Sequence, residues 1–270
     1  MRILRRLSIG AHAHPHLINL LGTYTHRNKH HLIFPWAEAD LAGYWKKETP
    51  QPSLTGDRAL WIAEQCHGLA EGLNRIHRYD TSSGTSLLGH EPDTQSEQAR
   101  RVPADPGSRR RLFGRHGDLK PENILWFPDS QSTGGHGILK ITDFGIARFS
   151  SENVMSARVR GLAPNSPTYR SPECDLINGE LSTACDIWAL GCVFLEFITW
   201  FFGGQIYRED FGKRRLAIDR DWAGISTDTF FTIVTDPRTG LRKAKVKDSV
   251  TQVLVPRALR AATTFTFKLH

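Results

Sequence analysis

Cysteine is scarce in this sequence, which has only four among 270 residues: Cys66, Cys174, Cys185 and Cys192. None belongs to a Cys-x-x-Cys pair, and no histidine pair at zinc-finger spacing lies near them. The pattern therefore predicts neither a disulfide framework nor a zinc site. Unpaired thiols are typical of a reducing compartment, so we expect an intracellular protein, either cytoplasmic or nuclear.

A long apolar run is missing as well. The longest one extends from Ile187 to Phe202 and contains Glu196. It is shorter than the roughly 20 residues that a helix needs to span a bilayer. This segment predicts a buried core helix, and we expect no membrane span.

Acidic residues are outnumbered by basic ones, 28 against 35, which gives a formal net charge of +7. Such a charge can suit nucleic acid, an acidic membrane face or an anionic nucleotide. The densest basic run, Arg109 to Arg111, lies in a stretch from Tyr79 to Arg111 that is rich in Ser, Gly, Pro and charge. We interpret this stretch as a disordered insert with scattered charge, so a nucleic-acid partner is the less favoured interpretation.

Hydrophobic residues make up 39% of the chain, enough for a globular core, and their periodicity predicts the elements of the first half. Residues 1–10 have the spacing of the end of a helix. Leu17–Tyr24 is expected to pair as a strand with His31–Trp36 across a turn at Arg27–Lys29. A short helix is expected at Leu41–Lys47.

The clearest helix of the first half is predicted from Asp57, as a candidate N-cap, to His77. Its apolar residues fall on one stripe, which we expect to be buried. The stripe consists of Leu60, Ala63, Cys66, Leu69, Ala70, Leu73 and Ile76.

In the second half, His116–Phe127 is predicted to be a loop followed by a strand. A Ser/Gly-rich hairpin at Asp129–Gly137 connects it to a second strand at Leu139–Thr142. Asp143–Glu173 has no clear period and is expected to be irregular. A strongly apolar helix is expected at Ser182–Phe202, starting at Ser182 or Thr183.

Three motifs follow one another in this half. They are His116–Asn123 (HGDLKPEN), Asp143–Gly145 (DFG), and Tyr169–Glu173 (YRSPE) with the following Asp186–Gly191 (DIWALG). Residues of these types suit phosphoryl transfer, which demands positioning and charge neutralisation more than covalent chemistry.

Each polar residue of the first two motifs has a role that its chemistry suits. Asn123 and Asp143 offer the oxygen ligands that Mg²⁺ prefers. Asp118 can orient an attacking hydroxyl and accept its proton, so it is the candidate catalytic base. Lys120 can neutralise charge on the transferred phosphate as a second catalytic residue.

This ordered set of motifs resembles the eukaryotic-type protein kinase family, and the resemblance extends from about His14 to Phe202. It implies an α+β protein-kinase-like fold with a remnant N-lobe sheet and a mainly helical C-lobe. Residues 1–37 would form the remnant N-lobe, with the end of a helix, two strands and the start of the hinge. Residues 38–250 would form the C-lobe, with the insert at about 79–112, and residues 251–270 an atypical tail.

The resemblance also implies a serine/threonine protein kinase that uses ATP and Mg²⁺ and acts on a protein substrate. Phe34 stands at the gatekeeper position, and Trp36 and Ala37 belong to the hinge that meets the adenine. Asp40 would approach the ribose. The remaining residues expected at the nucleotide are Lys120, Asn123 and Asp143, the last two as metal ligands.

Three further positions follow from the resemblance. Ser166 stands where serine/threonine kinases typically have a threonine, and Lys120 also fits that class. Asp186 matches the family's buried aspartate that holds the catalytic-loop backbone, with a simple acid at a helix N-terminus as the alternative.

The sequence also departs from the family. Gly117 replaces the arginine that usually precedes the catalytic aspartate, so we expect switching by an activation-loop phosphate to be weak or lost. No GxGxxG precedes His14, and the first acidic residue is Glu38. We could identify no arginine partner for Glu173 near the C-terminus. We therefore expect a kinase domain truncated at its N-lobe, and also at its C-terminus, with little phosphotransfer by this chain alone.

Three other functions remain open on the sequence. The first is a pseudokinase or scaffold binding module. The second is a small-molecule phosphotransferase, because His-Gly-Asp also occurs in kinases of antibiotics or choline. The third is a basic nucleic-acid binder. The protein substrate, the upstream regulation and the oligomeric state are not predicted.

Overall fold

The computed structural model describes residues 13–78, 112–143, 148–151, 167–176, 179, 181–219 and 224–252. The helix expected at 1–10, most of the insert and nearly all of the C-terminal tail lie outside these residues. Phe144, Gly145 and Ser166 do so too.

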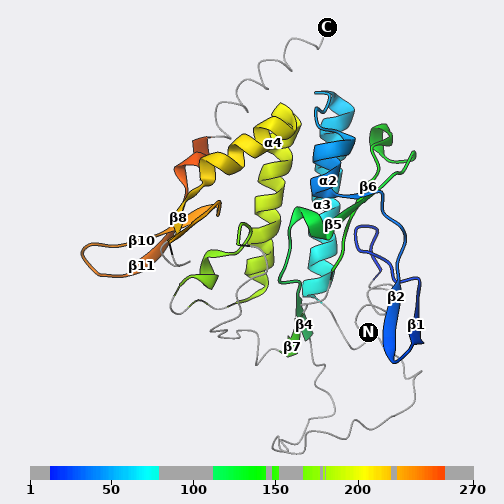
Figure 1. The fold of residues 1–270 in the computed structure, drawn as a ribbon, viewed down its shortest axis with the longest axis horizontal. Helices are drawn as coiled ribbons and strands as arrows, with labels where there is room; N and C mark the ends of the chain where they lie inside the picture. Colours follow the sequence, from blue (N-terminus) through cyan, green and yellow to red (C-terminus); the bar gives the residue numbers. More distant parts are fainter. Residues whose placement is uncertain are drawn as a thin grey trace, which may run out of the picture.

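Two long helices, α3 (Gly56–His77) and α4 (Thr183–Arg215), lie side by side at the centre of the molecule (Figure 1). The three-stranded sheet β3–β5–β6 and the β1–β2 hairpin lie beyond α3, and strands β8 to β11 lie on the opposite side, beyond α4. The arrangement is α+β, with small sheets around a helical centre, as expected.

The first hairpin consists of β1 (Gly22–His26) and β2 (Lys29–Ile33), which pair antiparallel. Its turn has two residues, Arg27 and Asn28, with φ of 48° and 58°. Positive φ at both central residues is the turn geometry that matches the twist of the two strands. The expected turn was one residue too long, because Lys29 already pairs with His26.

The expected first strand also began too early. Leu17 is not part of β1; it forms an isolated parallel bridge with Ile141 of β6 (Ile138–Ile141). This bridge buries Leu17, and it fixes the start of the described chain against the central sheet.

The chain then enters the central sheet through β3 (Ala39–Asp40) and forms the short helix α2 (Leu41–Gly43). A π-helical turn (Tyr44–Glu48) continues it, close to the helix expected at Leu41–Lys47. Asp40 caps α2, because its Oδ1 accepts a hydrogen bond from the Gly43 amide at 2.7 Å.

Helix α3 has the expected length, but its N-cap is Thr55 and not Asp57. Thr55 Oγ1 accepts a hydrogen bond from the Arg58 amide at 3.3 Å, whereas Asp57 lies in the first turn. A hydroxyl in extended backbone just before the helix can reach this amide, and a residue inside the helix cannot.

The buried face of α3 is rotated from the expected stripe, because Leu60, Ala63 and Ala70 are exposed. Polar residues take part in the buried face since each finds a partner. Arg58 donates to the Tyr44 hydroxyl at 2.8 Å, and Gln65 accepts from the Leu139 amide at 2.9 Å. Counting apolar residues alone therefore misplaced the stripe. The buried residues are Arg58, Trp61, Ile62, Gln65, Gly68, Leu69, Gly72, Leu73 and Ile76.

The second half begins with β4 (Leu112–Arg115), a loop and a 3-10 turn (Pro121–Asn123). Strand β5 (Ile124–Phe127) follows and pairs antiparallel with β6, and β5 also pairs with β3. The expectation of irregular structure after Asp143 was wrong at one place. There, β7 (Arg148–Ser151) pairs with β4.

Helix α4 begins where expected, with Ser182 as N-cap, and kinks at Gly204, where φ is 69°. The predicted helix end at Phe202 coincides with this kink, beyond which the helix continues to Arg215. By length and composition α4 could cross a membrane, but 61% of its apolar window is buried inside the molecule. The apolar run behaves as the expected core helix.

The core between α3 and α4 is built mainly from large rings. Trp45, Trp61 and Trp200 are fully buried, and the Phe197 ring centroid lies 5.6 to 5.7 Å from each of them. Tilted and edge-on contacts of this kind add stability beyond area burial.

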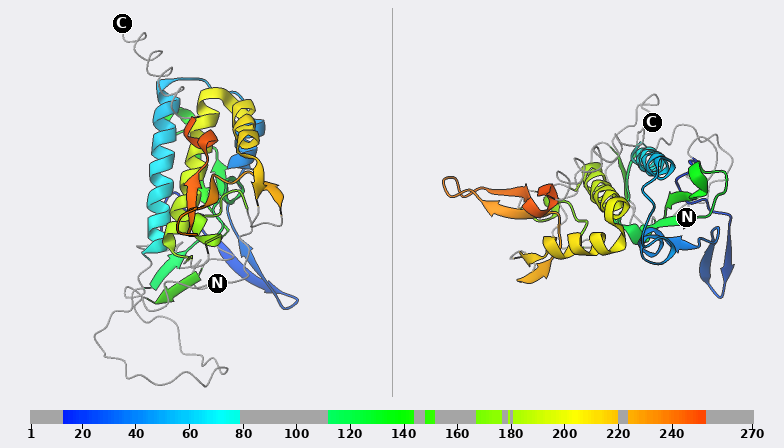
Figure 2. Two further views of the ribbon diagram at one scale, coloured as in Figure 1. Left: turned by 90° about the vertical axis from the view of Figure 1, so that its left-hand side faces the viewer. Right: turned by 90° about the horizontal axis from the view of Figure 1, so that it is seen from above.

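In the described residues after α4 the chain forms four short strands and then a helical turn at 248–252. Strands β8 (Ala217–Asp219) and β9 (Ile225–Thr227) pair with each other, as do β10 (Phe231–Thr235) and β11 (Arg242–Val246). The β10–β11 hairpin projects from the body of the molecule (Figure 2). The sequence had indicated no element here.

Candidate active site

The loop that begins at His116 is held by Asp186 of α4, a side chain that is only 1% exposed. The Asp186 carboxylate accepts hydrogen bonds from the amides of His116 and Gly117, each at 2.8 Å. His77 Nε2 lies 2.9 Å from the same carboxylate. Asp186 therefore fixes the loop backbone, as the resemblance implied, although it also lies in the first turn of α4.

His116 ties the same loop to the end of β6. Its Nε2 lies 2.7 Å from the Thr142 carbonyl, and its Nδ1 lies 3.3 Å from the Asp118 amide. A carbonyl can only accept and an amide can only donate. The ring is therefore the neutral tautomer with its hydrogen on Nε2.

The side chains of Lys120 and Asn123 converge on one carboxylate oxygen of Asp118, which is 8% exposed. Lys120 Nζ lies 3.0 Å from Asp118 Oδ2, and Asn123 Nδ2 donates to the same oxygen at 3.0 Å. Among the described residues, none donates a hydrogen bond to Asp118 Oδ1. One oxygen is thus held by the protein, and the other can accept a hydrogen bond from a bound molecule.

Asn123 is itself oriented by the loop backbone. Its Nδ2 also donates to the Asp118 carbonyl at 2.7 Å, which identifies this atom as the nitrogen of the amide. The amide oxygen therefore points away from Asp118. No described residue donates to it, so it can act as a ligand of a cation.

Asp143 follows directly after β6. The Thr142 amide donates to the Asn123 carbonyl at 2.9 Å, and this bond brings Asp143 beside Asn123 along the backbone. Asp143 has a φ of 58°, a left-handed conformation that few non-glycine residues adopt but that aspartate tolerates better than most, and its side chain is exposed.

The Asp143 carboxylate and the Asn123 amide oxygen suit a hard cation such as Mg²⁺. The described residues contain no group of three or more His, Cys, Asp or Glu side chains able to hold a metal ion by themselves. Mg²⁺ usually takes one or two protein ligands and completes its shell with phosphates and water, so the oxygens of Asn123 and Asp143 would be enough to hold it.

The expected hinge residues lie between β2 and the central sheet. Strand β3 pairs with β5, which begins directly after Asn123, so the expected hinge segment and the loop that begins at His116 are joined through one sheet. Phe34 and Ala37 are half-buried, whereas the Trp36 side chain is 87% exposed. Asp40 uses one carboxylate oxygen to cap α2.

The segment Tyr169–Glu173 is anchored by charged residues that the motifs did not indicate. The Tyr169 hydroxyl donates to Glu196 Oε2 at 3.0 Å. Burial and the neighbouring Glu196 carboxylate raise the pKa of Tyr169 well above its usual value. Arg208 and Arg215 bind the same carboxylate at 3.1 and 2.7 Å.

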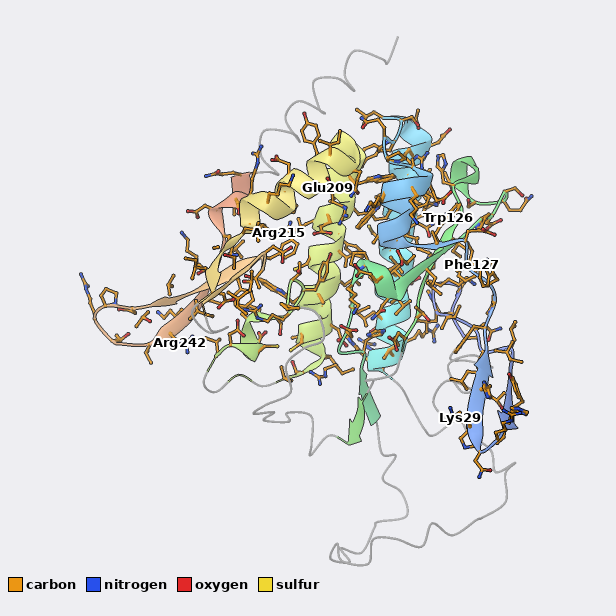
Figure 3. The ribbon with its side chains drawn as sticks, in the orientation of Figure 1. Lys29, Trp126, Phe127, Glu209, Arg215 and Arg242 are labelled. Carbon is orange, nitrogen blue, oxygen red and sulfur yellow. The ribbon has the colours of Figure 1, made fainter. Side chains whose placement is uncertain are left out.

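Glu196 could have been identified as a site of pairing from the sequence, because a carboxylate inside an apolar helix needs a partner. The partners of Glu196, however, could not have been identified from the sequence. Arg215 stacks between the rings of Phe211 and Phe230, with its guanidinium carbon 4.1 and 3.9 Å from their centroids (its place at the end of α4 is labelled in Figure 3).

Arg170 forms a second anchor of this segment. Its buried guanidinium pairs with Asp175 at 2.8 Å, and also with Asp219 of β8. Arg170 thereby joins the YRSPE motif to the strands that follow α4.

Comparison with known proteins points to one family. A family model described as the protein kinase domain matches residues 114–229. Cyclin-dependent kinase E-1 of Arabidopsis thaliana is 41% identical over 88 residues, which are 31% of this chain and 17% of the relative.

Two other similar proteins are also named as protein kinases. Serine/threonine-protein kinase unc-51 of Caenorhabditis elegans is 34% identical over 87 residues, 31% of this chain and 10% of the relative. Mitogen-activated protein kinase 5 of Arabidopsis thaliana is 40% identical over 85 residues, 31% of this chain and 19% of the relative. The chain thus matches a fifth or less of the length of these relatives.

Proposed function

We infer that this chain belongs to the eukaryotic-type protein kinase family, and we propose that it transfers the γ-phosphoryl group of ATP to serine or threonine hydroxyls of a protein. The proposal rests above all on one observation. Lys120 and Asn123 bind the same oxygen of Asp118, while its other oxygen has no partner among the described residues.

In this proposal Asp118 is the catalytic base. Its Oδ1 accepts a hydrogen bond from the substrate hydroxyl, aims that oxygen at the γ-phosphorus and takes up its proton. Asn123 and Lys120 hold the other oxygen, so the carboxylate cannot rotate away. Preorganisation of this kind removes most of the entropy loss of bringing the reacting groups together.

Asn123 and Asp143 would hold Mg²⁺, which neutralises charge on the phosphates of ATP. Lys120 has three N–H donors, of which Asp118 takes one. The other two can reach phosphate oxygens. Phe34, Ala37 and the backbone of the exposed Trp36 would face the adenine, and Asp40 retains one carboxylate oxygen for the ribose.

Specificity for serine and threonine is supported by Lys120, which fits that class by resemblance, and by a relative that is named a serine/threonine-protein kinase. An intracellular location is supported by the thiols, because all four cysteines are free.

The test is a pair of matched variants of the full chain, assayed with Mg-ATP and a library of Ser/Thr peptides. The sequence predicts little transfer by the unchanged chain, so the measure is the ratio between variant and unchanged protein. Asp118→Asn keeps the size of the side chain but removes the base, so we expect transfer to fall by about 100-fold or more relative to the unchanged protein. Asp129→Asn makes the same change in an exposed turn, where it accepts from the Gln131 amide. This control should retain full activity.

Transfer that survives Asp118→Asn would exclude the proposed base. Binding of Mg-ATP without any transfer by the unchanged protein would favour the pseudokinase or scaffold alternative.

A further inference from the structure

A cavity of about 260 Å³ lies away from the candidate active site, among β8, β10 and the segment that follows the YRSPE motif. Asp175, Asp219 and Lys247 supply its charged groups, and it is partly open to solvent. Phe231 and Ile233, which share one face of β10, give it an apolar wall.

Lys247 is held in this cavity by two backbone carbonyls. Its Nζ lies 2.5 Å from the Arg215 carbonyl and 3.3 Å from the Thr227 carbonyl. In the neutral amine, these two bonds use both N–H groups and leave the lone pair without a partner among the described residues. The amine is therefore fixed in place with its nucleophilic electron pair available.

The surrounding charges act on the pKa of Lys247 in both directions, and together they do not offset its burial. Asp228 and Asp219 face it, but Asp228 lies 3.9 Å from Arg215 and Asp219 pairs with Arg170. Asp175, the remaining carboxylate of the cavity, also binds Arg170. Burial therefore dominates and lowers the pKa of Lys247 to about 8, with Arg215 and Arg170 acting in the same direction.

We propose that Lys247 is a nucleophilic lysine that accepts an acyl group from a small activated acyl donor, a thioester or an acyl phosphate, bound in this cavity. The neutral amine attacks the acyl carbonyl carbon and forms a C–N bond. The C–S or C–O bond to the leaving group breaks, and the thiolate or phosphate departs with the electron pair. The nitrogen then loses one proton to solvent, which leaves a neutral amide.

This modification would reach the anchor of the YRSPE segment. An acylated lysine has one N–H, so either the Arg215 or the Thr227 carbonyl loses its hydrogen bond from Lys247. Arg215 binds Glu196, and Glu196 binds Tyr169. If the bond to the Arg215 carbonyl is the one lost, acylation of Lys247 loosens the backbone of the residue whose side chain holds Glu196 and, through it, Tyr169.

The experiment compares lysines of one chain. The full protein is exposed to an acetyl thioester of N-acetylcysteamine or to acetyl phosphate at pH 7.5. Acetylation is then followed by peptide mass spectrometry at Lys247, Lys243 and Lys245. The latter two are 66% and 59% exposed and serve as matched controls.

We expect Lys247 to react about ten-fold faster than either control, because a lower pKa leaves more neutral amine, although burial restricts access. Its rate should level off above about pH 9, whereas the rates of the controls should keep rising. Equal or slower reaction of Lys247 would overturn the proposal.

Two further measurements test the role of the cavity. In denaturing urea the three rates should become equal, and a preference for Lys247 that persists there would reject the proposal. Ile233→Trp narrows the cavity, so it should slow Lys247 without changing Lys243 or Lys245. An unchanged ratio of rates would show that the donor does not enter the cavity.

Discussion

Asp186 of α4 connects its helix to two other parts of the molecule through a single carboxylate. It accepts from two amides of the loop that begins at His116 and contacts His77 at the end of α3. A buried carboxylate with several donors is a good anchor because its charge is compensated by hydrogen bonds on both oxygens. The loop geometry therefore depends on a residue that is itself almost completely buried.

We expect Asp186→Asn to lower the free energy of unfolding by about 2–4 kcal/mol, because the new amide group would face backbone N–H donors and leave buried groups unpaired. Unfolding in urea measures the change. Asp210→Asn is the matched control on the same helix, since Asp210 forms an exposed pair with Arg214. Loss of this exposed pair should change the free energy of unfolding by less than about 1 kcal/mol. Equal effects of the two variants would contradict the anchoring role.

Lys247 should make the free energy of unfolding depend on pH in the alkaline range. Burial lowers the pKa of Lys247 to about 8 in the folded protein, from its ordinary value of 10.5. Between these values the unfolded chain binds more protons than the folded one, so stability rises as pH increases from 8 toward 10.5. Urea midpoints across this range should rise more in the unchanged protein than in Lys247→Met. Identical pH slopes would count against burial of the ammonium group.

At the scale of elements, α4 is two helical pieces joined at Gly204. The positive φ there lets the chain change direction. A Cβ at Gly204 would lie 2.4 Å from Gln51 Oε1 and 2.6 Å from the Pro50 carbonyl. The kink is thus required by both backbone conformation and close packing.

Gly204→Ala should therefore destabilise the protein by about 1–3 kcal/mol, as expected for an alanine forced into a left-handed conformation. Gly212 provides the control, because it is helical and no other group lies within 4 Å of its Cβ position. Gly212→Ala should be neutral or stabilising by up to about 1 kcal/mol. Thermal unfolding distinguishes the two, and a neutral Gly204→Ala would refute the account of the kink.

At the scale of the whole molecule, Glu196 connects segments that are far apart in the chain. Tyr169 precedes α4, Arg208 and Arg215 follow its kink, and all three bind one buried carboxylate. The network links the YRSPE segment to the β8–β11 region through α4.

Removal of this carboxylate should have a large effect. Glu196→Ala leaves the fully buried Arg215 without its nearest counter-ion, and breaking a buried pair in this way typically destabilises by about 3–5 kcal/mol. Unfolding in urea measures the loss, and hydrogen exchange should show weaker protection around Tyr169. A loss below about 1 kcal/mol, the value of an exposed pair, would mean that the network does not hold the molecule together.

The sequence by itself determined the features that depend on neighbouring residues. Helices α3 and α4, the β5–β6 hairpin and the resemblance to protein kinases were all predicted, although the buried face of α3 was not. Asp118, Lys120 and Asn123 lie within six positions of one another, so a short loop brings them together almost regardless of the rest of the fold.

Only the tertiary structure decided which distant groups meet. His77 and Asp186 are 109 positions apart, and Trp200 donates to the carbonyl of Thr49 across 151 positions. The buried face of α3 likewise depended on partners that Arg58 and Gln65 find elsewhere. The local sequence pattern indicates which residues prefer burial. A charged group or an amide, however, is stable in the interior only when the fold brings a hydrogen-bond or ion-pair partner to it.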